Sequence, residues 1–308
     1  MIRNQSLASA QPGRQVGVLL HPSRAEAVQA AAQFASHAAG RGVTCLFEDA
    51  RVQEVRAHVD VPVGVLTDPV DPDMAKLELV VVFGGDGTIL SASDWSVPAG
   101  IPLLGVNLGH VGFLAELESS EMTGLAEQVG DRDYEVEERL TLAIEVRDSS
   151  GQLVWRSHAI NELSLEKGVR QKMIEVKAQI DGRPLSRWGC DGVLVATPTG
   201  STAYAFSAGG PVIWPDVEAL LLVPLAAHAL FAKAMVLSPS SCVDLELSTD
   251  RATAAVVWAD GRRTLDLAPG SRVKVTRARR NLLLARLKEQ PFTDRLVRKF
   301  ALPVNGWR

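Results

Sequence analysis

The 308-residue chain contains little of several residue types, and each shortage excludes a class of protein. It has only three cysteines, Cys45, Cys190 and Cys242, which lie far apart and form no CxxC pair. They favour reduced thiols in a cytoplasmic protein over a disulfide framework or a zinc site. Positive charge is also scarce, because 36 acidic residues outnumber 32 basic ones and leave a net charge of −4. This balance argues against a nucleic-acid partner bound through a basic face.

Long hydrophobic runs are absent too. The most apolar window, residues 219–237, is interrupted by Pro224, His228 and Lys233, whereas a membrane span needs about 20 residues with almost no charge. We therefore expect no membrane partner, and a buried strand followed by another element in this window. Residues 1–14 are small and polar, with no apolar stretch typical of a signal sequence, and are predicted to form a flexible tail.

The length predicts about two domains, and hydrophobic and charged fractions of 46% and 22% exclude a disordered chain. The front half alternates strand and helix signals. Apolar runs at Val16–Leu20, Val43–Phe47, Leu79–Phe83 and Pro102–Val106 are typical of buried parallel strands. This alternation predicts an α/β domain over residues 15–137 with a doubly wound, mostly parallel sheet.

The hydrophobic period changes to two from about residue 140. Leu140–Val146 and Met173–Ile180 alternate apolar and polar side chains, and Asp-Gly turn signals such as Asp260-Gly261 follow similar runs. The pattern predicts an antiparallel all-β domain over residues 138–288. Residues 289–308 break the alternation, and we expect this tail to pack back on the α/β domain.

The sequence Gly-Gly-Asp-Gly-Thr, from Gly84 to Thr88, directly follows the clearest buried strand. Open α/β sheets bind ligands beyond the carboxyl ends of their strands, and glycines let backbone amides approach a polyphosphate. Asp86 would repel a phosphate, but it fits a group that takes a proton from a hydroxyl or engages Mg²⁺. The alternative is an ordinary tight turn. A helix is expected to begin near Thr88.

Familiar phosphate motifs do not match this loop. The dinucleotide fingerprint GxGxxG fails because its last position falls on Leu90, and the chain contains no GxxxxGK[ST] sequence. An ordinary Rossmann dehydrogenase and a P-loop kinase are both disfavoured.

The segment from Asn107 to Leu114 also follows an apolar strand. Its Gly109 and Gly112 predict a loop that backbone or ligand approaches closely. A proton shuttle is one interpretation of His110, but a hydrogen-bonded structural histidine is the more common case.

Asn161 and Glu162 lie in the strand-like segment Ala159–Leu165. Adjacent residues of a strand point to opposite faces, so one of the two would face the core unless a ligand is present. The alternative is a bulge or strand end that exposes both. A carboxylate beside an amide is suited to holding ribose hydroxyls.

The densest group of polar residues lies between Asp191 and Pro211. Its Thr197–Tyr204 stretch combines hydroxyls, a glycine and one of only two tyrosines, which suits a nucleoside better than a bare phosphate. The plainer interpretation is a turn in which Ser201 or Thr202 caps a short helix.

Together these segments resemble the NAD kinase family, in particular its ATP- or polyphosphate-dependent actinobacterial members. GGDG alone also occurs in diacylglycerol kinase-like and phosphofructokinase-like enzymes, but the Asn-Glu pair and the Thr/Ser-rich stretch ending in Thr-Ala-Tyr do not. The resemblance implies a diacylglycerol kinase-like α/β domain followed by a sandwich-like β domain. It also implies transfer of a terminal phosphoryl group from ATP, and in some members polyphosphate, to the 2′-hydroxyl of the adenosine ribose of NAD.

The resemblance also implies residue roles. Asp86 would be the catalytic base, and the donor phosphates would contact Gly84, Gly85, Gly87 and Thr88. The residues implied to bind NAD are Asp86, Gly87, Asn161, Glu162, Asp191, Thr199, Thr202, Ala203, Tyr204, Ser207 and Asp260. A divalent metal, Mg²⁺, would be carried mainly by the donor, with no metal site of the protein's own. The chain would form a homodimer or homotetramer.

Two departures from the family pattern and two alternative functions remain. Gly189 resembles the small residue of members that accept polyphosphate, which predicts use of both donors. Lys233 stands where members often have arginine, and it lacks arginine's bidentate fork. Lys167 has two interpretations, a group that steers the donor and a solvated surface charge. The alternative functions are a lipid or sugar kinase sharing the GGDGT site, and a non-catalytic NADP(H)-sensing protein.

Overall fold

The structure is a computed structural model. It describes residues 13–66, 77–109, 112–115, 117–118, 124–169, 172–250, 253–287, 291–304 and 306. The chain divides into two compact units, one made of Met1–Glu137 with Leu283–Arg308 and the other of Glu138–Leu282. None of the helices in the described ranges is long and apolar enough to cross a membrane.

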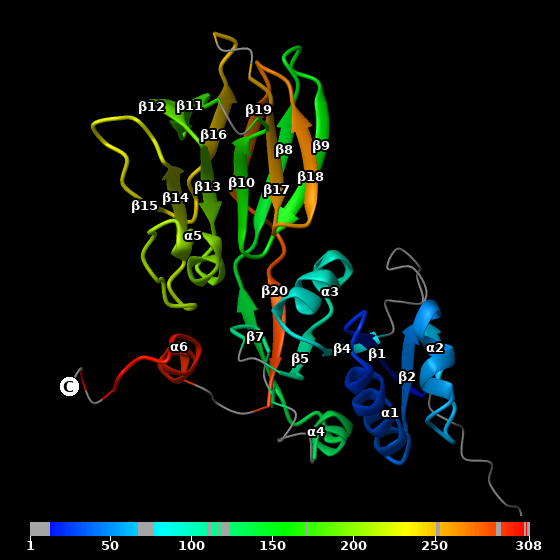
Figure 1. Cartoon of the computed structure of the whole chain (residues 1–308). Coiled ribbons are helices and arrows are strands. Elements are labelled where there is room, and N and C mark those ends of the chain that lie inside the picture. The colour runs from blue at the N-terminus through cyan, green and yellow to red at the C-terminus, as the bar shows by residue number, and fades with distance from the viewer. Residues whose placement is uncertain are drawn as a thin grey trace, which may run out of the picture. The chain divides into compact units, whose positions relative to one another are not determined.

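The first unit is built on one mostly parallel sheet with the strand order β3-β2-β1-β4-β5-β20-β7, in which β6 also pairs with β5. Strands β1, β2, β4 and β5 pair in parallel and are labelled in Figure 1. Its elements are β1 (Arg14–Leu20), α1 (Ala25–Ala39), β2 (Val43–Glu48), α2 (Asp49–Arg56), β3 (Gly64–Leu66), β4 (Leu77–Phe83), α3 (Asp86–Ala99), β5 (Leu103–Asn107), β6 (Leu117–Glu118), α4 (Leu125–Asp131), β7 (Glu135–Arg139), β20 (Leu282–Arg286) and α6 (Phe292–Phe300).

The core of the first unit anchors β4, the strand that leads into the GGDGT loop. Residues 79–83 of β4 are all buried, as expected for a strand covered on both faces. The alanine-rich helix α1 lies against the sheet, and its Phe34 ring contacts that of Phe83 at a centroid distance of 5.9 Å. The last residue of β4 is therefore held in place immediately before Gly84.

The second unit consists of two six-stranded sheets, with the orders β15-β14-β13-β10-β17-β18 and β12-β11-β16-β19-β8-β9. One buried cluster contains side chains from both sheets, so they pack as a sandwich (Figure 1). The elements are β8 (Leu142–Arg147), β9 (Leu153–Ala159), β10 (Glu162–Lys167), β11 (Ile174–Ile180), β12 (Arg183–Cys190), β13 (Gly192–Ala196), η3 (Thr199–Thr202), α5 (Tyr204–Ser207), β14 (Leu220–Leu225), β15 (Met235–Leu237), β16 (Val243–Leu247), β17 (Ala255–Ala259), β18 (Arg263–Leu267) and β19 (Arg272–Arg277).

The predicted fold class, an α/β domain followed by an all-β sandwich-like domain, is confirmed, but several boundaries differ. Arg14 belongs to β1 and not to a tail, because it pairs with Glu78 on the neighbouring strand; residues 1–12 lie outside the described residues. Strand β20 falls within the span predicted for the all-β domain, yet it pairs in parallel with β5 of the first sheet. The helix expected near Thr88 begins two residues earlier, at Asp86.

The prediction that Asn161 and Glu162 share one strand is wrong. Strand β9 ends at Ala159 in one sheet of the sandwich, and β10 begins at Glu162 in the other. Ile160 and Asn161 therefore form the crossing between the two sheets. At such a crossing the ladder of backbone hydrogen bonds is interrupted, so other groups must satisfy the backbone amides.

Candidate functional site

The GGDGT loop turns β4 into helix α3. Gly85 is the N-cap residue, and its carbonyl accepts hydrogen bonds from the amides of Thr88 (2.9 Å) and Ile89 (3.2 Å). Asp86 is the first residue of the helix, where a negative charge is favoured by the helix dipole. Gly84 is buried, and a Cβ there would lie 2.3 Å from Thr88 Oγ1. The glycine at position 84 thus has a packing reason of its own.

Gly85 and Gly87 differ from Gly84. A Cβ at either position would meet no atom within 4 Å, and neither residue has a positive φ. Gly87 is exposed and Gly85 is half-buried. Neither packing nor backbone conformation within the described structure therefore requires glycine at these two positions.

The Asp86 carboxylate is held by the loop that follows β5. The amide of Phe113 donates to Oδ2 at 2.9 Å, and the amide of Leu114 donates to Oδ1 at 3.1 Å. A Cβ at Gly112 would lie 2.2 Å from Oδ1. The glycines of this loop predicted that backbone or ligand approaches it closely. At Gly112 the group that approaches closely is the Asp86 side chain. His110 lies outside the described residues.

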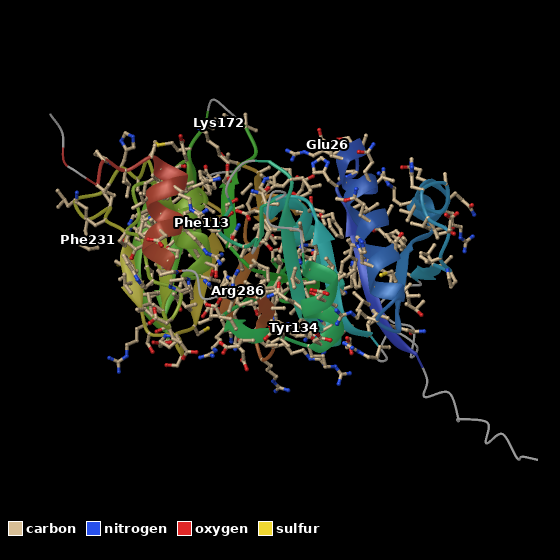
Figure 2. All side chains as sticks on the ribbon, turned by 90° about the horizontal axis from the view of Figure 1, so that it is seen from below. Glu26, Phe113, Tyr134, Lys172, Phe231 and Arg286 are labelled. Carbon is tan, nitrogen blue, oxygen red and sulfur yellow. The ribbon has the colours of Figure 1, made fainter. Side chains whose placement is uncertain are left out.

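The C-terminal helix α6 supports the same loop, although it lies far from it along the chain. Arg295 is buried, and its Nη1 donates to the carbonyl of Phe113 (2.9 Å) and that of Ala115 (3.3 Å). The rings of Phe292 and Phe300 lie 5.8 and 6.0 Å from that of Phe113, which Figure 2 labels together with Arg286. Sequence reasoning missed Arg295, because a lone arginine in a polar helix carries no pairing signal.

In the second unit, Asp260 holds the crossing between the sheets. Its carboxylate accepts hydrogen bonds from the amides of Ile160 (3.0 Å) and Asn161 (2.7 Å) and pairs with Arg263 Nη2 at 2.8 Å. Asp260 has a φ of 53° at the start of its Asp-Gly turn, and its side chain has no exposed surface. The carboxylate is therefore turned toward the backbone of Asn161, and no part of it is open to a ligand in this structure.

The segment after β13 holds Asn161 from a second direction. The amide of Thr197 donates to the carbonyl of Asn161 at 2.9 Å, and Thr197 Oγ1 donates to that of Ile160 at 2.5 Å. A Cβ at Gly200 would lie only 2.0 Å from the Asn161 carbonyl oxygen. Both backbone groups of Asn161 are thereby satisfied, which fixes the residue next to Glu162.

Glu162 is buried, with 7% of its surface exposed. Burial, followed by the charge of Asp260, raises the pKa of the Glu162 carboxyl to about 8, although a hydrogen bond from the Tyr204 amide opposes the shift. Its Oε2 is buried and has no hydrogen-bond partner among the residues that the structure describes. A buried polar atom without a partner is uncommon and requires an explanation.

A pocket of about 620 Å³ lies within the second unit. Three residues implied to bind NAD line it, namely Asp191, Tyr204 and Ser207. Lys167 lines it as well, and its Nζ donates to Asp191 Oδ1 at 2.6 Å. The Lys167 side chain is 24% exposed and ion-paired, so it is not a fully solvated charge.

Three further residues of the predicted NAD set, Thr199, Thr202 and Ala203, lie in the segment that leads into α5 and do not line the pocket. Thr199 is buried in η3, and Thr202 Oγ1 donates to its carbonyl at 3.2 Å. Ala203 is the N-cap of α5. Ser201, one of the two alternative caps in the turn interpretation, instead bonds to both backbone groups of Ile213.

No group of three or more His, Cys, Asp or Glu side chains that could hold a metal ion occurs among the residues that the structure describes.

Comparison with known proteins identifies the family. The ATP-NAD kinase N-terminal domain matches residues 16–134, and the ATP-NAD kinase C-terminal domain matches residues 160–287. The chain belongs to the NAD kinase family. A curated NAD kinase from Cutibacterium acnes is 52% identical over 96% of this chain and 92% of its own. One from Thermobifida fusca is 49% identical over 96% of this chain and 91% of its own.

Solved structures agree with this assignment. A yeast NADH kinase complexed with NADH superposes with a TM-score of 0.85 over 97% of this chain and 90% of its own, at 24% identity, and so shows the fold. An NAD kinase from Archaeoglobus fulgidus in complex with ATP has a TM-score of 0.64 and 25% identity, over 94% of this chain and all of its own. The enzyme is thus a kinase that phosphorylates NAD, and the lipid-kinase, sugar-kinase and sensor alternatives are set aside.

Proposed function

We propose that this kinase transfers the terminal phosphoryl group of ATP to the 2′-hydroxyl of the adenosine ribose of NAD, with Asp86 as the base. The main support for this proposal is the position of the Asp86 carboxylate, which accepts hydrogen bonds from two backbone amides. Each carboxylate oxygen has a second lone pair, so the group can still accept the hydroxyl proton. Phosphoryl transfer depends mainly on positioning, and a carboxylate fixed by backbone is well positioned.

The donor phosphates are proposed to contact Gly85 and Gly87 at the start of α3. Packing does not explain why these two positions are glycine. Phosphate binding explains it, because a phosphate contacts the backbone amides at a helix N-terminus and glycine has no side chain to obstruct it. The ATP complex of the Archaeoglobus fulgidus enzyme supports ATP as the donor. Gly84 and Thr88 contribute by packing on each other and so shaping the loop.

NAD is proposed to bind against the second unit. Tyr204, a residue that is 39% exposed, offers an aromatic ring at the wall of the pocket, which the Lys167–Asp191 ion pair also lines. Asn161 and Glu162 would hold the ribose region. Asp260 would act through Asn161, because its own carboxylate is fully enclosed.

The described residues include no group of three or more His, Cys, Asp or Glu side chains that could hold a metal ion. We propose that a divalent cation such as Mg²⁺ arrives on the donor phosphates.

Polyphosphate is proposed as a second donor. A Cβ at Gly189 would meet nothing within 4 Å, so the surface beside the Gly189–His228 bridge stays open. NADP formation from NAD and polyphosphate in ATP-free buffer is the expected result, and absence of product would refute this part.

The chain is proposed to assemble as a homodimer or homotetramer. Leu230 and Phe231 expose apolar surface in the connection between β14 and β15, and Figure 2 labels Phe231. Sedimentation of wild type and of Phe231→Ser tests this, since a wild-type monomer at micromolar concentration would contradict it.

The assignment of Asp86 is tested by Asp86→Asn. General-base catalysis contributes about 10²–10⁴-fold, so we expect NADP formation to fall by at least about 100-fold. The dissociation constant of NAD should change little, as measured by calorimetry. Asp131→Asn is the matched control, because Asp131 lies in the same unit and pairs with Arg41 on the surface. Near-normal turnover in Asp86→Asn would remove Asp86 from the mechanism.

A further inference from the structure

Two buried carboxyl groups lie next to each other in the second unit. Glu162 begins β10, and Asp260 follows the neighbouring strand β17, with its amide donating to the Glu162 carbonyl at 3.0 Å. Each residue exposes only 7% of its surface. Two carboxylates that close together in a buried site do not both ionise readily, because each disfavours the charge of the other.

Hydrogen-bond donors around the two groups show which one keeps its charge. Asp260 accepts from two backbone amides and from the guanidinium of Arg263. Donors to the charged form stabilise it. Glu162 receives one backbone amide, that of Tyr204, and its buried Oε2 receives no donor from the described part of the chain. The charge therefore belongs on Asp260.

We propose that Glu162 is an uncharged carboxylic acid in the folded enzyme and donates a hydrogen bond to an acceptor atom of the bound dinucleotide. This rests on the proposed function, in which Asn161 and Glu162 hold the ribose region of NAD. An uncharged acid offers an O–H donor, and no described residue supplies an acceptor for it at Oε2, whereas a second carboxylate would repel the diphosphate of NAD. Asp260 acts as a positioning residue in two ways, because it fixes Asn161 and keeps the proton on its neighbour.

The other titratable groups near Glu162 favour the same state. Glu166 on the same strand adds to the rise in the Glu162 pKa, after burial and Asp260. The nearby cations are engaged with other groups, since Arg263 pairs with Asp260 and Lys167 pairs with Asp191. Among the described residues, the titratable and charged groups near this site include Asp260, Arg263, His158, Glu166, Lys167, Asp191 and the Tyr204 phenol.

The protonation state is measured first, without any nucleotide. Infrared spectra of the full chain at neutral pH should contain a band of a protonated carboxyl group that is missing from Glu162→Gln. Unfolding supplies a second readout. Between the carboxyl's ordinary pKa and about 8, the folded state binds a proton that the unfolded state has lost, so stability falls as pH rises. Glu162→Gln does not lose stability in this way. The melting temperature of Glu162→Gln minus that of wild type should therefore increase from pH 5 to pH 8.

Binding of NAD is then measured by calorimetry between about pH 6 and pH 9, without a phosphate donor. The wild-type dissociation constant should be constant up to about pH 8 and then rise, approaching tenfold per pH unit. Glu162→Gln, which is always uncharged and keeps an N–H donor, should show no such rise. Asp260→Asn should shift the rise to lower pH. Glu145→Gln, at a carboxylate on β8 that pairs with Arg156, should behave as wild type.

Two results overturn the proposal. An ionised Glu162 at neutral pH refutes it directly, and so does an NAD affinity with the same pH dependence in wild type and Glu162→Gln. Neither result depends on whether Asp260→Asn folds. NADP formation by wild type and Asp86→Asn is assayed in parallel, so a failure of the proposed catalytic role is recognised separately.

Discussion

Gly112→Ala tests how the Asp86 carboxylate is placed. The new Cβ would lie 2.2 Å from Oδ1, 2.8 Å from Cγ and 3.0 Å from Oδ2 of Asp86, so the whole carboxylate must move. Movement breaks or lengthens its hydrogen bonds to the amides of Phe113 and Leu114. Hydrogen bonds to charged groups contribute about 1.5–3 kcal/mol each. Because Asp86 is partly exposed and water can replace some of the lost interaction, we expect the unfolding free energy to fall by about 2–4 kcal/mol.

Activity should respond more strongly than stability. A displacement of about 1 Å in a reacting group can cost about 100-fold in rate, so NADP formation at saturating NAD and ATP should fall by at least that factor in Gly112→Ala. Gly13→Ala is the matched control. It is in the same unit, and its Cβ would make only an ordinary contact of 3.9 Å with Thr44.

A double-mutant cycle decides whether the clash is with Asp86. In an Asp86→Ala background the carboxylate is gone, so Gly112→Ala should then cost less than about 1 kcal/mol in denaturant unfolding. An equal cost in both backgrounds would show that Gly112 is needed for another reason, and that its role is not to make room for the carboxylate.

Two further predictions concern the second unit and the thiols. Gly200→Ala places a Cβ 2.0 Å from the Asn161 carbonyl oxygen, so Asn161 must move. Calorimetry should then show NAD binding weakened by at least about tenfold. Unchanged affinity would contradict the proposed role of Asn161. Burial raises the pKa of Cys45 and Cys190 to about 12 and, with less burial, that of Cys242 to about 11. Iodoacetamide at about pH 8 should therefore label the native enzyme slowly and the denatured enzyme at all three thiols, because the thiolate is the reactive form; rapid labelling of native protein would contradict this.

The sequence by itself determined the two-part fold and the family. Runs of apolar residues at Leu79–Phe83 and Pro102–Val106 have no period, so they are recognisable as strands buried on both faces. The alternation at Met173–Ile180 identifies a strand with one face in a core. Local patterns of this kind suffice because they depend only on which side of each element meets water.

Contacts between distant segments could not be read in that way. Sequence reasoning placed Asn161 and Glu162 in one strand, because no local signal marks a chain that leaves one sheet for another at Ile160. It also could not reveal that the Asp260 carboxylate accepts hydrogen bonds from backbone amides about a hundred positions earlier in the chain.

The sequence thus determined that Asp86 follows a buried strand among glycines, and that an Asn-Glu pair and a hydroxyl-rich turn exist. Only the tertiary structure decided that Gly112 makes room for the Asp86 carboxylate, that Arg295 supports the same loop, and that Glu162 lies beside Asp260. The physical reason is that burial and charge act through space. The state of a carboxyl group depends on neighbours that the fold brings close, whatever their separation along the chain.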